Sequence, residues 1–255
     1  MSQKPKKIYS YPEYYDVLFG WNRSDEVLFV DKLAQKLDCP GSSFLEVACG
    51  TGTVSRQLCF LGWEPIGIDL SEEMVKEMNF QMNKIRKKTW AYLGDMAKFK
   101  LPVKIDLAYC ALGSLGLLTK DEEFVSHFKC IKEHLSEGGI YLIDVGLQVD
   151  TKSSTKPCDL NSLVWAMETD SVYVEASDGI VKVEDDAKGL KLNLEWDAVP
   201  LEFNIDHLKT LISESGLEID SIYPQAGVTD EGIPNFDLDV NELKVGIDRA
   251  MFVLK

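Results

Sequence analysis

The residues best suited to chemistry are two glycines and a carboxylate in the first third of the chain. Gly50 and Gly52 belong to the sequence EVACGTGT, residues 46–53, which follows a short apolar segment. Glycines let a ligand approach the backbone, and the start of a following helix offers unpaired N–H groups. Asp69 ends the next apolar segment, and a carboxylate there can accept hydrogen bonds from two ribose hydroxyls. This spacing predicts a nucleotide-type cofactor site at a strand-to-helix junction.

A nicotinamide dinucleotide is one alternative ligand for such a junction. Its G-x-G-x-x-G fingerprint requires a glycine at position 55, where this chain has Ser55. The third glycine of the fingerprint lets the helix pack closely on the strand. Its replacement disfavours an NAD-linked dehydrogenase, although Asp69 would serve either cofactor.

Around the junction, short apolar segments alternate with longer segments of helical periodicity. Strands are expected at residues 43–47, 64–69, 90–94, 104–110, 140–145, 217–223 and 249–254. Helices are expected from 53 to 62, after the caps Ser71 and Asn204, and after a capping box at 119–122, this last one closed by Gly138 and Gly139. The pattern predicts an α/β fold, a Rossmann-like seven-stranded, mostly parallel sheet with helices on both faces.

Residues from about 147 to 203 interrupt this alternation. The segments 172–174, 180–183 and 190–196 alternate as short antiparallel strands do, with turns between them. We interpret them as a small β-rich cap inserted after the fifth strand into one domain, residues 1–255. Residues 224–246 are expected to form an irregular surface excursion.

Composition limits the partners and the location. The net charge of −15, from 42 acidic and 27 basic residues, repels phosphate backbones, so nucleic acid is not an expected partner. Six cysteines stand singly, without the spacing of zinc or dithiol motifs, and most of them are expected to be buried thiols in a reducing compartment. No segment has the apolar length of a signal peptide or membrane span, so a cytoplasmic location is expected. Monomer and homodimer both remain open.

Four short sequences together resemble a known family. They are FLEVACGTG at 44–52, GIDLSEEM at 67–74, GDM at 94–96 followed by Phe99, and LSEGGIYLIDV at 135–145. In their order and spacing the chain resembles class I S-adenosylmethionine-dependent methyltransferases of the small-molecule type. VACGTG combined with GDM resembles in particular enzymes that N,N-dimethylate amino sugars.

The resemblance implies S-adenosylmethionine as the cofactor and a role for each matching residue. The implied cofactor-binding residues are Tyr15, Phe19, Glu46, Ala48, Cys49, Gly50, Thr51, Gly52, Asp69, Leu70, Asp95, Met96, Cys110 and Ala111. The residues from 46 to 52 would surround the methionine and ribose, Asp69 would take the ribose hydroxyls, and Leu70 would pack on adenine. Asp95 would accept from the adenine amino group beside the Met96 backbone, with Cys110 and Ala111 near the sulfonium. The sequence YYD at 14–16, with Phe19, resembles a lid, about residues 1–30, that closes over the cofactor.

The methyl acceptor must be held by whatever covers the strand ends. The expected acceptor-binding residues are Tyr11, Trp21, Trp165 and Trp196. Aromatic faces stabilise cationic amines, and a cap of this kind suits a small molecule. Methyl transfer is an in-line displacement that depends mainly on alignment in a dry site, and no catalytic residue is identified. Tyr15 and His207 are the catalytic candidates. His207 is the only histidine considered as a base, whereas His127 and His134 are expected at the surface or edge of their helix.

No metal site is expected, because Asp144 has no second acidic ligand beside it and residues 109–111 carry none. Residues 106–109 also lack the Asp/Asn-Pro-Pro-aromatic sequence of nucleic-acid N-methyltransferases. Three functions remain open. The first is a methyltransferase that N- or O-methylates a small molecule. The second is a protein methyltransferase or a non-catalytic cofactor-binding subunit, which sequence does not separate from the first. The third is the disfavoured dehydrogenase.

Overall fold

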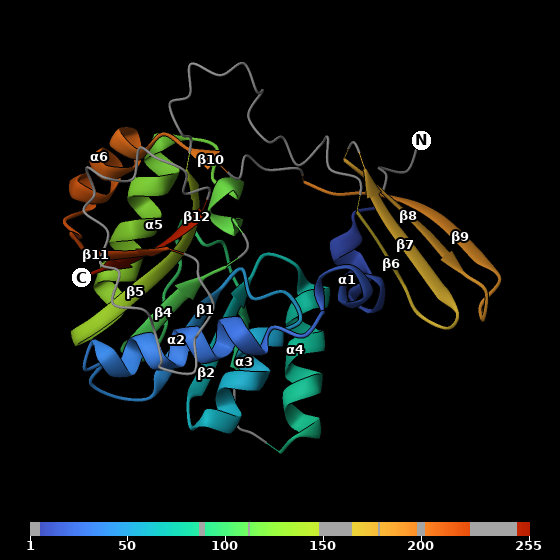
Figure 1. Cartoon of the computed structure of the whole chain (residues 1–255), viewed down its shortest axis with the longest axis horizontal. Helices are drawn as coiled ribbons and strands as arrows, with labels where there is room; N and C mark the ends of the chain where they lie inside the picture. Colours follow the sequence, from blue (N-terminus) through green and yellow to red (C-terminus); the bar gives the residue numbers. More distant parts are fainter. Residues whose placement is uncertain are drawn as a thin grey trace.

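A seven-stranded sheet lies at the centre of this computed structural model (Figure 1). The structure describes residues 6–86, 90–111, 113–147, 165–177, 179–197, 202–224 and 249–255. The strand order is β11-β12-β5-β4-β1-β2-β3, and a two-residue strand, β10, pairs with β5. Among the described strands of this sheet, β12 alone runs antiparallel to the others. The predicted Rossmann-like, mostly parallel sheet is confirmed.

The main-sheet strands are β1 (Ser43–Val47), β2 (Glu64–Asp69), β3 (Trp90–Leu93), β4 (Ile105–Cys110), β5 (Leu135–Leu147), β10 (Glu202–Phe203), β11 (Ile219–Pro224) and β12 (Arg249–Leu254). The cap strands are β6 (Trp165–Glu168), β7 (Val172–Ser177), β8 (Ile180–Asp185) and β9 (Leu190–Glu195). The α-helices are α1 (Pro12–Phe19), α2 (Ser24–Lys36), α3 (Thr53–Leu58), α4 (Glu72–Lys84), α5 (Asp121–His134) and α6 (Ile205–Ser215). The short 3-10 helices are η1 (Ile8–Ser10), η2 (Cys59–Leu61) and η3 (Ser114–Leu117).

Helices cover both faces of the main sheet because its central strands are apolar on both sides. Side chains of α2 and α3 pack on one face, with Phe44, Leu107 and Leu142 of the sheet. Side chains of α5 and α6 pack on the opposite face, against the alternate strand residues, for example Leu45 and Ala108. This layering brings the carboxyl ends of β1, β2 and β4 to one edge of the sheet, where ligands bind in open α/β folds.

Two predicted helix caps are confirmed and the third is wrong. The Ser71 hydroxyl accepts from the Met74 N–H at 3.3 Å, and the Asn204 side chain accepts from the His207 N–H at 3.0 Å. The capping box predicted at 119–122 does not form, because α5 begins one residue later, with Lys120 at the cap position. Instead, the Glu123 carboxylate reaches back to accept from the Thr119 N–H at 3.0 Å.

The end of α5 and two of its histidines also differ from the predictions. The helix ends at His134, and β5 begins at Leu135, where pairing with Ile105 holds the chain in the sheet instead of in a helix closed by two glycines. His127 and His134 were expected near the surface. Their side chains are buried, with 0% and 7% of the residue exposed. Burial is possible because each ring finds hydrogen-bond partners inside the protein.

The insert forms a four-stranded antiparallel sheet, β6-β7-β8-β9, one strand more than predicted. The N-terminal segment packs on this sheet, and Figure 1 shows α1 beside β6 and β7. Ile8, Tyr14 and Leu18 share a hydrophobic core with Val174, Val181 and Leu194. The lid and the cap are therefore one structural unit. The predicted excursion at 224–246 lies outside the described residues, apart from Pro224.

Within the described ranges, no helix combines the length and apolarity needed to cross a membrane. The same part of the chain contains no group of three or more histidine, cysteine or acidic residues arranged to hold a metal ion.

Candidate active site

The loop after β1 turns sharply because its glycines adopt left-handed backbone angles. Gly50 has φ of 53° and Gly52 has φ of 76°, a region that costs little for glycine. A β-carbon on Gly50 would lie 3.2 Å from the Tyr15 hydroxyl oxygen, and one on Gly52 would lie 2.6 Å from the Met78 Cγ. The loop ends at Thr53, the first residue of α3. Glycine at both positions is therefore favoured by the left-handed turn and by the close approach of Tyr15 and Met78.

Asp69 ties the end of β2 to this loop. One of its carboxylate oxygens accepts from the Gly50 N–H at 2.8 Å, and the other accepts from the Ser71 N–H at 2.8 Å. Burial raises the pKa of Asp69, and the backbone hydrogen bonds oppose that rise. Each oxygen keeps a further lone pair, so the carboxylate can still accept from a ligand.

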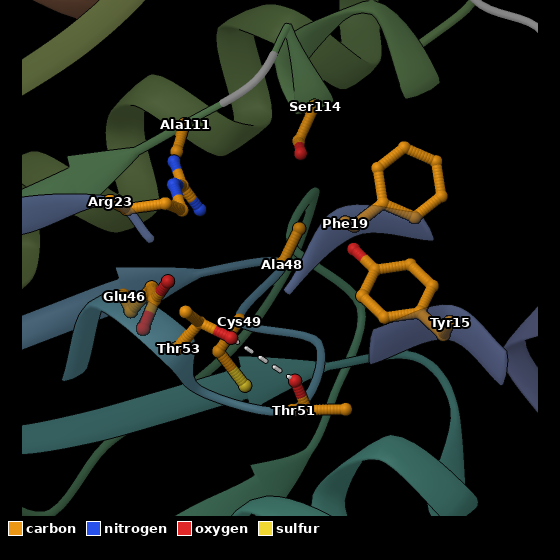
Figure 2. A pocket seen from close by; sticks show the side chains of 10 residues that line it. All are labelled: Tyr15, Phe19, Arg23, Glu46, Ala48, Cys49, Thr51, Thr53, Ala111 and Ser114. Atoms are coloured by element: carbon orange, nitrogen blue, oxygen red, sulfur yellow. Dashed lines mark hydrogen bonds between the residues drawn. The ribbon is translucent and has the colours of Figure 1, made fainter. Parts of the chain in front are cut away.

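A pocket lies between this loop, the lid and the end of β4 (Figure 2). It is lined by Tyr15, Phe19, Arg23, Glu46, Ala48, Cys49, Thr51, Thr53, Ala111 and Ser114. Figure 2 shows the rings of Tyr15 and Phe19 on one side and the side chains of Arg23 and Glu46 on the other. The pocket therefore joins an aromatic wall to a charged one.

Arg23 contributes a buried cation that sequence reasoning missed. Only 6% of the residue is exposed, and its guanidinium pairs with Glu26, with Nε donating to Oε2 at 2.7 Å. The Tyr109 hydroxyl donates to the same Glu26 carboxylate. An arginine directly after the lid aromatics, at the start of a helix, was the available signal. The bidentate pair orients the guanidinium at the pocket wall.

Glu46 lies opposite the lid with its carboxylate held by α3. It accepts from the Ser55 N–H at 3.0 Å and from the Ser55 hydroxyl at 2.5 Å. Burial raises the pKa of Glu46 to about 7, opposed by the bonds from Ser55 and by the charge of Arg23. Ser55, which stands where a dinucleotide fingerprint has glycine, thus serves as the partner of Glu46.

The lid helix α1 contacts the loop through Asp16, Tyr15 and Phe19. The Thr51 hydroxyl donates to the Asp16 carboxylate, and the Arg56 guanidinium lies 3.9 Å from it. The rings of Tyr15 and Phe19 are 4.7 Å apart between centroids, and Phe19 stacks on Trp196 of the cap at 5.7 Å. Burial, first, and the nearby Asp69 charge raise the pKa of Tyr15, so its hydroxyl stays protonated at neutral pH.

The structure brings together half of the cofactor-binding residues predicted from the sequence. Those that line the pocket are Tyr15, Phe19, Glu46, Ala48, Cys49, Thr51 and Ala111. Gly50, Gly52 and Asp69 lie in or against the same loop, while Leu70 is 76% exposed beside it. Asp95 and Met96 follow β3, and the Cys110 thiol is buried, which raises its pKa to about 12. Besides Arg23, the lining residues that the sequence did not indicate are Thr53 and Ser114.

The residues predicted for the acceptor and for catalysis are more widely spread. Tyr11 and Trp196 pack against the core shared by lid and cap, and Trp21 is 37% exposed beside Phe19. The Trp165 side chain lies outside the described part of the structure. His207 does not line the pocket. Its ring pairs with Asp121 at 2.9 Å at the start of α6, which gives no support for a role as a base.

Comparisons with known proteins agree with this geometry. Residues 44–139 match the family model described as methyltransferase domain. A Streptomyces venezuelae protein, dTDP-3-amino-3,4,6-trideoxy-alpha-D-glucopyranose N,N-dimethyltransferase, is 27% identical over 133 residues, which cover 51% of this chain and 54% of that protein. The chain thus spans about half the length of this relative.

Two solved structures resemble nearly the whole chain. An S-adenosylmethionine-dependent methyltransferase from Clostridium acetobutylicum superposes with a TM-score of 0.71 at 18% identity, over 94% of this chain and 95% of that one. A sugar N-methyltransferase from Streptoalloteichus superposes with a TM-score of 0.67 at 19% identity, over 100% and 94%. These likenesses show a common fold. With the matching domain model, they confirm the resemblance predicted from the four sequence motifs.

Proposed function

We propose that this chain, which carries a methyltransferase domain on the fold of S-adenosylmethionine-dependent enzymes, methylates an amino group of a small molecule. The observation that carries the proposal is the pocket at the glycine loop, with the Arg23 cation at one wall and Asp69 tethered to Gly50 beside it. A buried cation can bind the carboxylate of the methionine part of S-adenosylmethionine, and an aspartate can accept hydrogen bonds from its ribose hydroxyls. The relative that N,N-dimethylates an amino sugar supports nitrogen as the acceptor atom.

The residues present fit S-adenosylmethionine. A β-carbon at Gly50 would lie 3.2 Å from the Tyr15 ring, so glycine at this position lets the lid ring lie close against the loop. Arg23 would hold the methionine carboxylate, and Asp69 would hold the ribose. Leu70, Asp95 and Met96 would flank adenine, with Cys110 and Ala111 near the sulfonium. The cofactor would supply an electrophilic methyl group.

The chain's own contribution is alignment and exclusion of water. Tyr15 and Phe19 cover the glycine loop, and Trp196 of the cap stacks on Phe19, so the acceptor would enter between lid and loop. The raised pKa values of Tyr15 and Cys110 keep both groups protonated at neutral pH, so neither accepts a proton from the acceptor. An amine that arrives deprotonated needs no base, and proximity then supplies most of the rate acceleration. Tyr11, Trp21, Trp165 and Trp196 remain the residues we expect to hold the acceptor.

The covered pocket favours a small acceptor over a protein. The lid and the cap share one core over the glycine loop, whereas a protein substrate calls for an open groove. We also propose a cytoplasmic location, since the five described cysteines are free thiols, a state that a reducing compartment maintains. A monomer and a homodimer are equally compatible with the proposal.

Calorimetry with S-adenosylmethionine, S-adenosylhomocysteine and NAD tests the cofactor. We expect the first two to bind and to raise the melting temperature, because a ligand selective for the folded state stabilises it. A methyl-transfer assay with a panel of amines, alcohols and a protein extract then tests the acceptor. Binding of NAD alone would refute the cofactor. Methylation confined to proteins would refute the acceptor class, and cofactor binding without transfer to any substrate would favour a non-catalytic subunit.

A further inference from the structure

The loop between β3 and β4 is fastened to α5 by side chains of that helix. The loop carries Asp95 and Met96, which the proposed function places at adenine. The Met96 carbonyl lies 2.8 Å from Nδ1 of His127, and the Ala97 carbonyl accepts from the Ser126 hydroxyl at 2.6 Å. Two helical turns after His127, the Leu101 N–H donates to Nε2 of His134 at 2.8 Å. The helix thus determines the shape of the loop.

The proton on His127 can be assigned from its two partners. A carbonyl oxygen only accepts, so the proton lies on Nδ1 and is donated to Met96. Nε2 is then an acceptor, and the Tyr141 hydroxyl donates to it at 2.7 Å. Complete burial lowers the pKa of His127 to about 4, which keeps the ring neutral at physiological pH.

The peptide group that His127 holds is also bonded to Asp95. The Met96 carbonyl and the Ala97 N–H belong to one planar peptide unit. His127 binds the carbonyl side of this unit, and the Ala97 N–H donates to the Asp95 carboxylate at 2.8 Å on the other side. Rotation of the peptide would break both bonds. The orientation of the Asp95 carboxylate therefore depends on a ring that does not itself face the pocket.

We propose that His127 is a positioning residue for the adenosine half of the cofactor, acting through the Met96–Ala97 peptide on the Asp95 carboxylate. The proposal rests on the proposed function, which places Asp95 at adenine. In this proposal, the hydrogen bond from Nδ1 of the ring to the Met96 carbonyl determines the affinity for the cofactor. The other bond, from Tyr141 to Nε2, contributes to stability alone.

Two substitutions separate these bonds. In His127→Asn, the side-chain amide nitrogen can take the place of Nδ1 and still donate to Met96. In His127→Gln, the longer side chain places its amide at the position of Nε2, so the contact with Tyr141 is kept and that with Met96 is lost. Each variant loses one buried hydrogen bond, so both are expected to lower the melting temperature. Two variants serve as controls: Tyr141→Phe removes the Nε2 bond and leaves the Nδ1 bond in place, and His134→Gln alters the other buried histidine of α5, seven residues later.

Dissociation constants for S-adenosylmethionine and adenosine are measured by calorimetry in each folded variant. We expect His127→Gln to weaken both ligands by about fivefold to tenfold, as loss of one hydrogen bond does. His127→Asn, Tyr141→Phe and His134→Gln should stay within about twofold of the wild type despite lower melting temperatures. In an Asp95→Ala background, His127→Gln should cause no further loss of affinity.

Equal affinities of the Asn and Gln variants would overturn the proposal, and so would a His134→Gln variant that binds as weakly as His127→Gln. If His127→Gln does not fold, the Asn and Tyr141→Phe variants decide: a loss of affinity in either contradicts the assignment to the Nδ1 bond, and unchanged affinity in both supports it. A wild-type protein that binds neither ligand refutes the proposed function instead, since the inference concerns only how a binding site is shaped.

Discussion

The Asp69 carboxylate accepts a 2.8 Å hydrogen bond from the backbone N–H of Gly50, so the end of β2 holds the glycine loop directly. These two residues are nineteen positions apart and meet only because β1 and β2 are adjacent parallel strands. The bond fixes the turn whose left-handed Gly50 lies under the Tyr15 ring. The shape of the loop therefore depends on this carboxylate, and under the proposed function cofactor binding depends on it too.

Asp69→Ala is expected to weaken S-adenosylmethionine binding by about 1 to 3 kcal/mol, through lost hydrogen bonds to the ribose and a loosened loop. Calorimetric titration measures the loss. Asp106→Ala is the matched control, because Asp106 also accepts hydrogen bonds from Ser43 and Ser136 but lies at the opposite end of the parallel strands. The control should lose stability and keep its affinity. Equal loss of affinity in both variants would contradict a ligand role for Asp69.

Arg23→Met tests the charged wall of the pocket. We expect S-adenosylmethionine to bind about 1.5 to 3 kcal/mol more weakly, the range for a hydrogen bond to a charged group. Methylthioadenosine, which lacks the amino-acid carboxylate, should bind the variant as it binds the wild type. Stability should also fall, because the Glu26 carboxylate loses its positively charged partner. An equal loss for both ligands would show that Arg23 acts on the fold instead of the carboxylate.

Tyr14 and Asp185 join the lid to the cap through a buried hydrogen bond of 2.9 Å. We expect the double variant of Tyr14→Phe and Asp185→Ala to lower the melting temperature by less than the sum of the two single variants, because residues that share one bond are not additive. Methyl transfer should fall more than cofactor affinity, since the bond lies between lid and cap and not at the glycine loop. Tyr173→Phe is the control, because its hydroxyl bonds Glu175 within the cap alone. Strict additivity of the two single changes would refute the coupling.

Deleting residues 1–21, or replacing residues 160–198 by a short linker, tests the covered pocket as a whole. Each change removes one half of the core that lid and cap share. We expect methyl transfer to be lost more severely than cofactor binding, measured by turnover and calorimetry on the same preparations. Full turnover in both truncated forms would favour a protein substrate that docks on an open face.

Stability is expected to depend on pH through His127. In the folded protein its pKa is about 4 against an ordinary 6.5, so below pH 6.5 the unfolded chain binds a proton that the folded ring refuses. The stability that the neutral ring provides is complete above pH 6.5 and is lost as pH falls toward 4. Between pH 7 and pH 5 the loss is about 2 kcal/mol.

Glu46 acts in the opposite direction over nearly the same range. Its pKa is raised from 4.5 to about 7, so its contribution to stability is present below pH 4.5 and is lost as pH rises through 7. The contribution of His127 is therefore measured as the difference between the acid-induced losses of stability in the wild type and in the His127→Gln variant. Denaturant unfolding of the wild type and of His127→Gln at pH 7 and pH 5 should show the smaller acid loss in the variant. Identical losses would refute the assignment.

The sequence by itself determined the main sheet and the glycine loop. Short apolar segments bounded by glycines and caps have local causes, so β1, β2 and β12 begin and end at or next to the predicted residues. The motif around Gly50 and the aspartate at position 69 could be recognised from the sequence because a tight turn and a strand end each require particular residue types locally. From these, the fold and the resemblance to methyltransferases followed.

Only the tertiary structure decided which polar residues are buried together. Arg23 enters the pocket because α2 packs on the sheet, where Glu26, the partner of Arg23, accepts a hydrogen bond from Tyr109, a contact between residues 83 positions apart that no spacing rule predicts. His127 looked like a surface residue because histidine on a polar helix usually is one. Its burial depends on Met96 and Tyr141, which come from two other elements. Similarly, the lid is joined to the cap by the hydrogen bond from Tyr14 to Asp185, which are 171 positions apart in the sequence. Local sequence patterns do not predict such a long-range contact.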